Sequence, residues 1–174
     1  TLIQVWEFLE LNALWGLYVA GADPYNQSSS VYSTSLGSCI IYKRMIDISG
    51  SNYYNMLVAS YAGRLKTMNE WHENVEMLLE WYNAICMPEN EATTFIQYMD
   101  QKKKIHYLAD GLTLAKQINL LTTTTSRIKG LAATPLNINY CMSLFYEYCK
   151  EQVQYGQDEM GNLIYKMGVW RILD

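Results

Sequence analysis

Two acidic residues follow apolar segments, in positions where their carboxylates could bind a metal ion. Asp23 comes directly after segment 16–22 (GLYVAGA), and Glu89 follows segment 84–87 (AICM) with only Pro88 between. If both segments are neighbouring strands, both carboxylates emerge at one edge of the sheet. Hard divalent cations such as Mg²⁺ prefer oxygen ligands of this kind. Two such ions can activate a water molecule and stabilise the leaving oxygen in phosphodiester cleavage.

The same positions also have a structural interpretation. Asp23-Pro24 is a frequent way to open a turn, and Pro88-Glu89-Asn90 fits an ordinary loop. Taken singly, each acid at such a position is more often structural than catalytic. The spacing of the two acids therefore does not choose between these interpretations.

The elements that would position these acids begin with three strands. Segments 16–22, 35–46 and 53–61 are predicted as strands, because they are apolar and are joined by connections rich in Ser, Asn and Gly. Thr67 and Glu70 then fit the capping box of a helix. One apolar stripe at helical spacing follows, made of Trp71, Val75, Leu78, Leu79 and Tyr82.

Strands and helices alternate in the next part of the chain. Segment 84–87 is predicted as a strand, a helix capped by Thr93 or Thr94 follows, and segment 105–109 is predicted as another strand. This order implies parallel crossovers. Segment 112–130 contains the run TTTT, which is poor helix material, and is expected to be a loop.

A last helix is predicted from Thr134 as N-cap, with Pro135 at the first helical position, to about Val153. Its buried side is expected to comprise Ile138, Cys141, Phe145, Tyr148 and Cys149.

Length and composition indicate one globular domain, residues 1–174. The chain has 174 residues, of which 50% are hydrophobic and 17% are charged. It shows no leader segment and no long apolar run, so we expect no membrane partner, and the missing initiator Met suggests a piece of a larger protein. The four cysteines form no CxxC pair, which indicates buried thiols in a reducing compartment and no zinc site.

The charge balance argues against nucleic-acid binding as a property of the whole domain. The formal net charge is −4, whereas phosphate neutralisation needs a basic face. Local basic pairs occur at Lys43-Arg44, Arg64/Lys66 and Arg127/Lys129. Such cations are more often solvated surface residues than phosphate contacts.

An ordered set of segments resembles a known family. These segments are YVAGADPYNQ (18–27), STSLGSCIIYKR (33–44), YAGRLKTMNEWHENV (61–75), AICMPEN (84–90), LAD (108–110) and IKGLAATP (128–135). Together they resemble the nuclease domain of the large terminase subunit of tailed phages, in a branch associated with crAss-like and gut-bacterial phages. The resemblance runs from about Trp6 to Asp174.

The resemblance implies a ribonuclease H-like α/β fold, in which helices flank a central mixed sheet of five or more strands. It makes Asp23 the first ligand and Glu89 the second ligand of two Mg²⁺ or Mn²⁺ ions, with Asn90 positioning water or a ligand. The family's third aspartate lies near the C-terminus in a context that this chain lacks, which leaves Asp174 as the candidate. Asp158 and Asp110 fit turns better, and Glu91 competes with Glu89.

The implied function is cleavage of concatemeric double-stranded viral DNA by two-metal hydrolysis during packaging. Phosphate contacts would then fall to Lys43, Arg44, Arg127 and Lys129. No G-x-x-x-x-G-K-[ST] loop occurs, so the family's ATPase domain is expected upstream in the same polypeptide. The other implied partners are a small terminase subunit and the portal protein, at the procapsid in the host cytoplasm.

Two alternatives stay open. One is another ribonuclease H-like nuclease, such as a junction resolvase. The other is a catalytically silent module that binds nucleic acid or protein, which the net charge of −4 favours.

Overall fold

The computed structural model describes residues 3–25, 35–44, 55–91, 93–111 and 129–167. The chain forms two compact units, Thr1–Ala132 and Ala133–Asp174, and each is described by itself. Arg127 and Asp174 lie outside the described residues.

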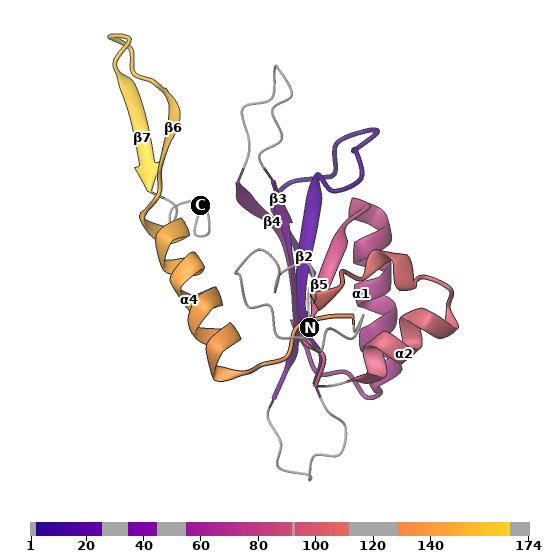
Figure 1. Ribbon diagram of the computed structural model, residues 1–174. Helices are drawn as coiled ribbons and strands as arrows, with labels where there is room; N and C mark the ends of the chain where they lie inside the picture. Colours follow the sequence, from indigo (N-terminus) through magenta and orange to yellow (C-terminus); the bar gives the residue numbers. More distant parts are fainter. Residues whose placement is uncertain (1–2, 26–34, 45–54, 92, 112–128, 168–174) are drawn as a thin grey trace. The chain divides into compact units, whose positions relative to one another are not determined.

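The first unit is built on a five-stranded sheet (Figure 1). Its strands are β1 (Ile3–Val5), β2 (Tyr18–Asp23), β3 (Gly37–Lys43), β4 (Met56–Gly63) and β5 (Ile85–Pro88), in the order β1-β4-β3-β2-β5. The pair β2–β5 is parallel, and the other three pairs are antiparallel. This confirms the predicted α/β class, with three antiparallel strands and a fourth that returns parallel to the first. Strand β1 was not predicted.

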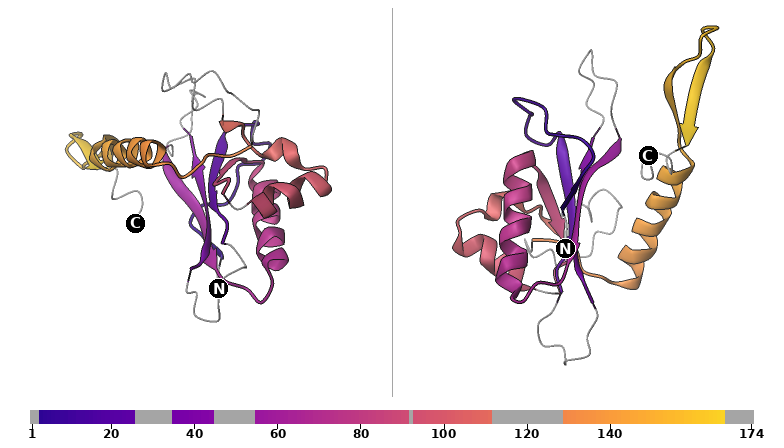
Figure 2. Two further views of the ribbon diagram at one scale, coloured as in Figure 1. Left: turned by 60° about the horizontal axis from the view of Figure 1, so that its bottom comes forward. Right: turned by 180° about the vertical axis from the view of Figure 1, so that it is seen from behind.

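Helices α1 (Met68–Tyr82) and α2 (Thr93–Gln101) lie on one side of this sheet, as the opposed views of Figures 1 and 2 show. The Thr67 side chain accepts a hydrogen bond from the Glu70 backbone N–H, which confirms the predicted N-cap. Helix α1 ends at Asn83, whose left-handed backbone donates to the carbonyls of Leu79 and Glu80. All five residues of the predicted apolar stripe are buried.

At Gly37 the helix layer lies close against the sheet. A Cβ at this position would lie 2.5 Å from Trp71 Nε1 and 2.8 Å from Tyr25 Cδ1. Glycine on β3 therefore allows the indole of α1 to pack directly against the strand. Trp71, Tyr82 and Phe95 from the helices then form the core with Tyr18 and Tyr61 from the strands.

Segment 105–109 differs from the prediction of a strand. Ile105–Tyr107 is a 3-10 turn, η1, in which Tyr107 and Leu108 donate to the carbonyls of Lys104 and Ile105. These hydrogen bonds use the backbone groups that a strand would offer its neighbour. Only Leu108 pairs with β5, through an isolated parallel bridge to Cys86.

The second unit contains helix α4 (Pro135–Lys150) and a hairpin of β6 (Gln152–Gln157) and β7 (Leu163–Met167). Thr134 caps the helix by accepting from Asn137 N–H, and Pro135 takes the first turn, as predicted. The predicted buried side is wrong, because Ile138 and Phe145 are 48% and 52% exposed and no described residue of α4 is buried. Cys141 is exposed as well, whereas Cys39 and Cys86 are buried thiols as expected.

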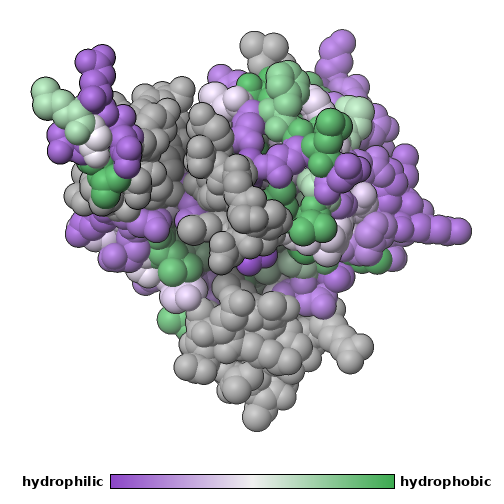
Figure 3. Space-filling model, turned by 90° about the horizontal axis from the view of Figure 1, so that it is seen from above, coloured by the Kyte–Doolittle hydropathy of each residue, from purple (hydrophilic) through white to green (hydrophobic). Residues whose placement is uncertain are grey.

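Several large apolar side chains of the first unit are exposed. They include Trp6, Phe8, Leu11 and Leu14 in the segment before β2, and Trp81 of α1, whose ring centroid lies 6.1 Å from that of Phe8. Figure 3 shows apolar side chains gathered among polar ones on one face. Within the described residues, no helix is long and apolar enough to span a bilayer.

Candidate active site

The parallel pairing of β2 and β5 brings the two predicted acids together. Val19 is paired with Ile85 and Ala22 with Pro88, so Asp23 and Glu89 are the next residues on the two strands. The Glu89 N–H continues the ladder by donating to the Ala22 carbonyl at 2.7 Å. Since side chains alternate along a strand and Ala22 and Pro88 face the core, Asp23 and Glu89 emerge on the opposite side. Their carboxyl groups are in hydrogen-bonding contact.

This contact changes the acidity of Glu89. The hydrogen bond with Asp23, followed by partial burial and the negative charges of Asp23 and Glu91, raises the pKa of the Glu89 carboxyl to about 7. Two neighbouring carboxylates repel each other when both are ionised, so Glu89 keeps its proton at pH values well above 4.5. Such a pair is a favourable site for a cation or for proton transfer.

The short segment 129–131 lies beside the end of β5, on the side opposite β2, and forms hydrogen bonds with it. Leu131 donates from its N–H to the Pro88 carbonyl at 2.8 Å and accepts from the Asn90 N–H at 3.1 Å. Gly130 has a φ of +82°, and a Cβ there would lie 2.4 Å from the Pro88 carbonyl oxygen. The backbone on both sides of Glu89 is therefore fixed. The hydrogen bond from the Asn90 N–H to Leu131 also fixes the position of Asn90. It does not assign the Asn90 side chain a role in positioning water.

The Lys129 side chain also links segment 129–131 to the residues that follow η1. Its ammonium lies 2.9 Å from Asp110 Oδ1 and donates to the Leu108 carbonyl at 2.8 Å. Asp110 thus has a structural partner, in keeping with its assignment to a turn. The Lys129 side chain remains 25% exposed, so the charge lies near the surface at the Glu89 end of the sheet.

Lys43 does not offer its charge to a ligand. Its side chain is 1% exposed, and its ammonium forms ion pairs with Glu7 and, at 2.7 Å, with Glu10. Burial alone would lower the pKa of Lys43, but the hydrogen bonds to Glu10 and Glu7 outweigh burial and raise it. The phosphate contact expected for Lys43 is inconsistent with this position, because Lys43 is on the inward-facing side of β3.

Arg44 is exposed but lies far from the two acids. Lys43 is paired with Tyr18 at the start of β2, whereas Asp23 is paired with Ser38 at its end. At about 3.3 Å per residue, five residues separate the two ends by about 17 Å. Arg44 donates to the Gly16 carbonyl at 3.2 Å and has no place at the Asp23 end of the sheet.

Arg64 is a cation at the Asp23 end of the sheet that was not among the predicted phosphate contacts. It directly follows Gly63, which is paired with Gly37 at the start of β3, next to the Ser38 that is paired with Asp23. Its guanidinium donates to the Ser35 carbonyl at 2.9 Å and lies 5.1 Å from the Tyr25 ring centroid. The signal in the sequence was its place just after β4, which runs in the same direction as β2 and so ends at the same edge of the sheet as Asp23.

A third acidic ligand is not found among the described residues, where no group of three or more His, Cys, Asp or Glu side chains is placed to hold a metal ion. Asp158 lies in the β6–β7 turn, where its carboxylate accepts hydrogen bonds from the Met160 and Asn162 N–H groups. Glu91 is exposed and acts on Glu89 only through its charge.

The class that fold and site define is a mixed α/β domain with a carboxyl pair at the end of a parallel strand pair. No family model, curated protein or solved structure matches the chain.

Proposed function

We propose that the chain is the metal-dependent endonuclease domain of a viral DNA-packaging terminase, with a ribonuclease H-like sheet. The observation that carries this proposal is the contact between the Asp23 and Glu89 carboxyl groups at the ends of two adjacent parallel strands. The strand order β4-β3-β2-β5 also has the three antiparallel strands and the parallel return that this fold class requires.

The chemistry of the pair fits a hard divalent cation. Both donors are carboxylates, and their contact raises the pKa of Glu89 to about 7, so ionisation of both is unfavourable without a compensating positive charge. Mg²⁺ or Mn²⁺ supplies that charge and, when bound, lowers the pKa of water and offsets negative charge on a phosphodiester. The ions would be held by Asp23 and Glu89, with Asp174 remaining the proposed third ligand.

The protein's own contribution is to hold the two carboxylates in place. The β2–β5 ladder fixes their spacing, and segment 129–131 prevents the end of β5 from moving away. The surrounding cations would orient double-stranded DNA, and we assign this role to Arg64 in place of Lys43. Lys129 and Arg127 remain proposed phosphate contacts. Proposed partners are the ATPase domain, the small terminase subunit and the portal protein, in the host cytoplasm.

A second candidate is a silent binding module. It is favoured by two observations: among the described residues no third side chain is placed with Asp23 and Glu89 to hold a metal ion, and the net charge is −4. Such a module would retain the carboxyl pair without cleaving a substrate.

Plasmid cleavage distinguishes the two candidates. Supercoiled plasmid is incubated with the protein and Mn²⁺, beside Asp23→Asn, Glu89→Gln and the matched control Glu91→Gln. We expect nicking and linearisation by the wild type and the control, and a loss of at least about 100-fold in the other two variants. Mn²⁺ affinity, measured by calorimetry, should fall in the same two variants.

If none of the proteins cleaves DNA and Mn²⁺ does not bind, the nuclease proposal is wrong and the binding module takes its place. Equal cleavage by the wild type and by both site variants would indicate a contaminating nuclease. That result would also contradict the proposed role of the pair.

A further inference from the structure

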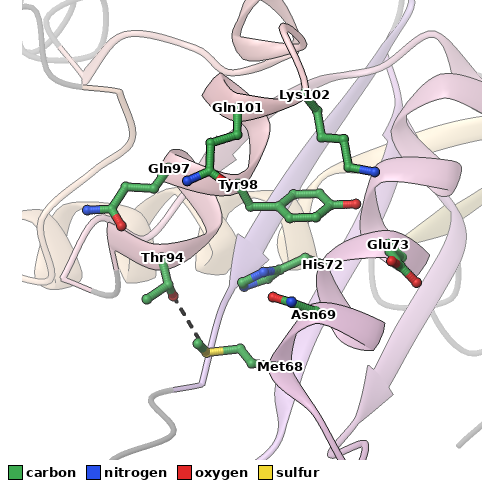
Figure 4. A pocket seen from close by; sticks show the side chains of 9 residues that line it. All are labelled: Met68, Asn69, His72, Glu73, Thr94, Gln97, Tyr98, Gln101 and Lys102. Carbon is green, nitrogen blue, oxygen red and sulfur yellow. Dashed lines mark hydrogen bonds between the residues drawn. The ribbon is translucent and has the colours of Figure 1, made fainter.

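A hollow of about 510 Å³ lies between α1 and α2 (Figure 4). It is separate from the carboxyl pair, because none of its lining residues belongs to β2 or β5. Its volume falls in the range of sites for small molecules. Helix α1 contributes His72 to its lining, and α2 contributes Tyr98, with polar side chains around both.

His72 is the unusual group in this lining. It is 1% exposed, and within the described residues no group is placed to hydrogen-bond either of its ring nitrogens. The rings of Phe95 and Tyr98 flank it, with centroids at 5.5 and 5.1 Å. Burial lowers the pKa of His72 to about 4, so at neutral pH the imidazole is uncharged and carries one N–H donor and one acceptor. Figure 4 shows the imidazole beneath the Tyr98 ring, at the hollow.

Amide side chains line the outer part of the hollow. Asn69 comes from α1, and Gln97 and Gln101 lie one turn apart on α2, all three exposed. An amide group presents a donor and an acceptor side by side. The charged residues of the lining, Glu73 and Lys102, have opposite signs, so the hollow has no net preference for a charged ligand.

We propose that this hollow binds the planar, uncharged ring of a nucleobase, with His72 and the amides of Gln97 and Gln101 as its hydrogen-bonding groups. A nucleobase offers adjacent donors and acceptors, and Gln or Asn side chains pair in this way with the N6 and N7 edge of adenine. Its flat face matches the aromatic ring of Tyr98, which lines the hollow beside His72, as in other base-binding sites. A sugar or a phosphate offers hydrogen bonds without such a face. The inference does not depend on the metal chemistry proposed for Asp23 and Glu89.

The two histidines of the chain make a direct test possible. In the ¹⁵N-labelled protein, His72 and the exposed His106 give separate imidazole signals that can be followed while adenosine is added. We expect adenosine to shift the His72 signals and to leave those of His106 in place. Ribose 5-phosphate, which lacks the base, should shift neither.

Variants locate the binding. His72→Phe keeps an aromatic ring but removes both nitrogens, and should weaken adenosine binding by at least about tenfold, because the buried hydrogen bonds are lost. His106→Phe is the matched control and should bind as the wild type does. Gln97→Leu and Gln101→Leu are surface changes that leave the core intact, so they give the answer if His72→Phe fails to fold. Asp23→Asn should not change the affinity.

Three results would overturn the proposal. The first is that saturating adenosine leaves the His72 signals unchanged, which would make His72 a structural residue. The second is that ribose 5-phosphate binds as well as adenosine. The third is undiminished binding in the folded His72→Phe protein, or in both glutamine variants.

Discussion

Among the candidate site residues, Glu89 is the one whose pKa is strongly shifted. Its pKa rises from 4.5 to about 7 in the folded chain, so between these values the folded state binds more protons than the unfolded state. The contribution of Glu89 to the stability of the metal-free protein is therefore expected to fall as the pH rises from about 4.5 to about 7. His72, whose pKa falls from 6.5 to about 4, acts in the opposite direction.

Replacing Glu89 with Gln isolates its contribution, because the effect of His72 is common to both proteins. We expect Glu89→Gln to be more stable than the wild type at pH 8 by about 1 to 3 kcal/mol, and to show little difference at pH 4. Urea unfolding in the presence of EDTA at both pH values gives the two free energies. A wild type and variant with parallel pH profiles would show that the pKa of Glu89 is not raised in the folded chain. Glu91→Gln serves as the exposed control.

Lys43 and Arg44 are neighbours in sequence with opposite structural roles. Lys43→Ala would leave Glu7 and Glu10 without their buried partner. Because these carboxylates are 25% and 39% exposed and can be partly rehydrated, we expect a loss of about 1 to 3 kcal/mol of unfolding free energy. Arg44→Ala should change it by less than about 0.5 kcal/mol. Urea unfolding of the two variants checks this difference, and equal effects would contradict it.

Sequence alone could indicate the two acids but could not show how the cations are used. Asp23 and Glu89 stand at the ends of recognisable apolar segments, and a parallel pair of such strands brings them together. Lys43 also stands at a strand end, but its charge is used by Glu7 and Glu10, which are over thirty residues away in the sequence. Long-range pairing of this kind has no local signal.

Among the elements, segment 129–131 has a larger role than its length suggests. Gly130→Ala combines a positive φ with a Cβ 2.4 Å from the Pro88 carbonyl oxygen, so the segment must move away from β5. Gly16 has a similar φ of +86°, but a Cβ there would be 3.9 Å from its nearest neighbours, which makes Gly16→Ala a control for backbone strain alone. We expect losses of at least about 2 kcal/mol for Gly130→Ala and about 1 kcal/mol for Gly16→Ala.

Thermal or urea unfolding compares these two variants, and Mn²⁺ titration shows whether the site is affected. If segment 129–131 supports Glu89, Gly130→Ala should also weaken Mn²⁺ binding, whereas Gly16→Ala should not. Equal losses of stability, with unchanged metal affinity in both, would show that the segment is dispensable for the site.

Elements with strong local signals were predicted well. The cap at Thr67 and the stripe from Trp71 to Tyr82 are local features, and they define α1 as the structure has it. Segment 105–109 is apolar as a buried strand is, but Lys103 adopts a positive φ of 59° after α2, and the chain turns into η1 before it can extend along β5. The apolar character of this segment correctly indicated that Leu108 is buried, but it could not indicate that the backbone of residues 105–107 forms a 3-10 turn.

At the scale of the whole molecule, the buried apolar residues that the structure describes all lie in the first unit. Every buried apolar residue of the described chain lies between Leu17 and Leu108, and no described residue of α4 is buried. Since burial of apolar surface supplies most of the stability of a domain, residues 1–132 should fold alone with a cooperative transition. Residues 133–174 alone should show none. Circular dichroism and urea unfolding of the two fragments check this.

The same division tests the third ligand. Fragment 1–132 retains Asp23 and Glu89 but lacks Asp174. If the folded fragment binds Mn²⁺ about as tightly as the whole chain, the pair binds the ion without Asp174. If its affinity falls by about tenfold or more, residues 133–174 contribute a ligand, and Asp174→Asn in the whole chain should reproduce the loss. A fragment 1–132 that fails to fold would show that residues 133–174 stabilise the first unit, and Asp174→Asn alone would then decide the ligand.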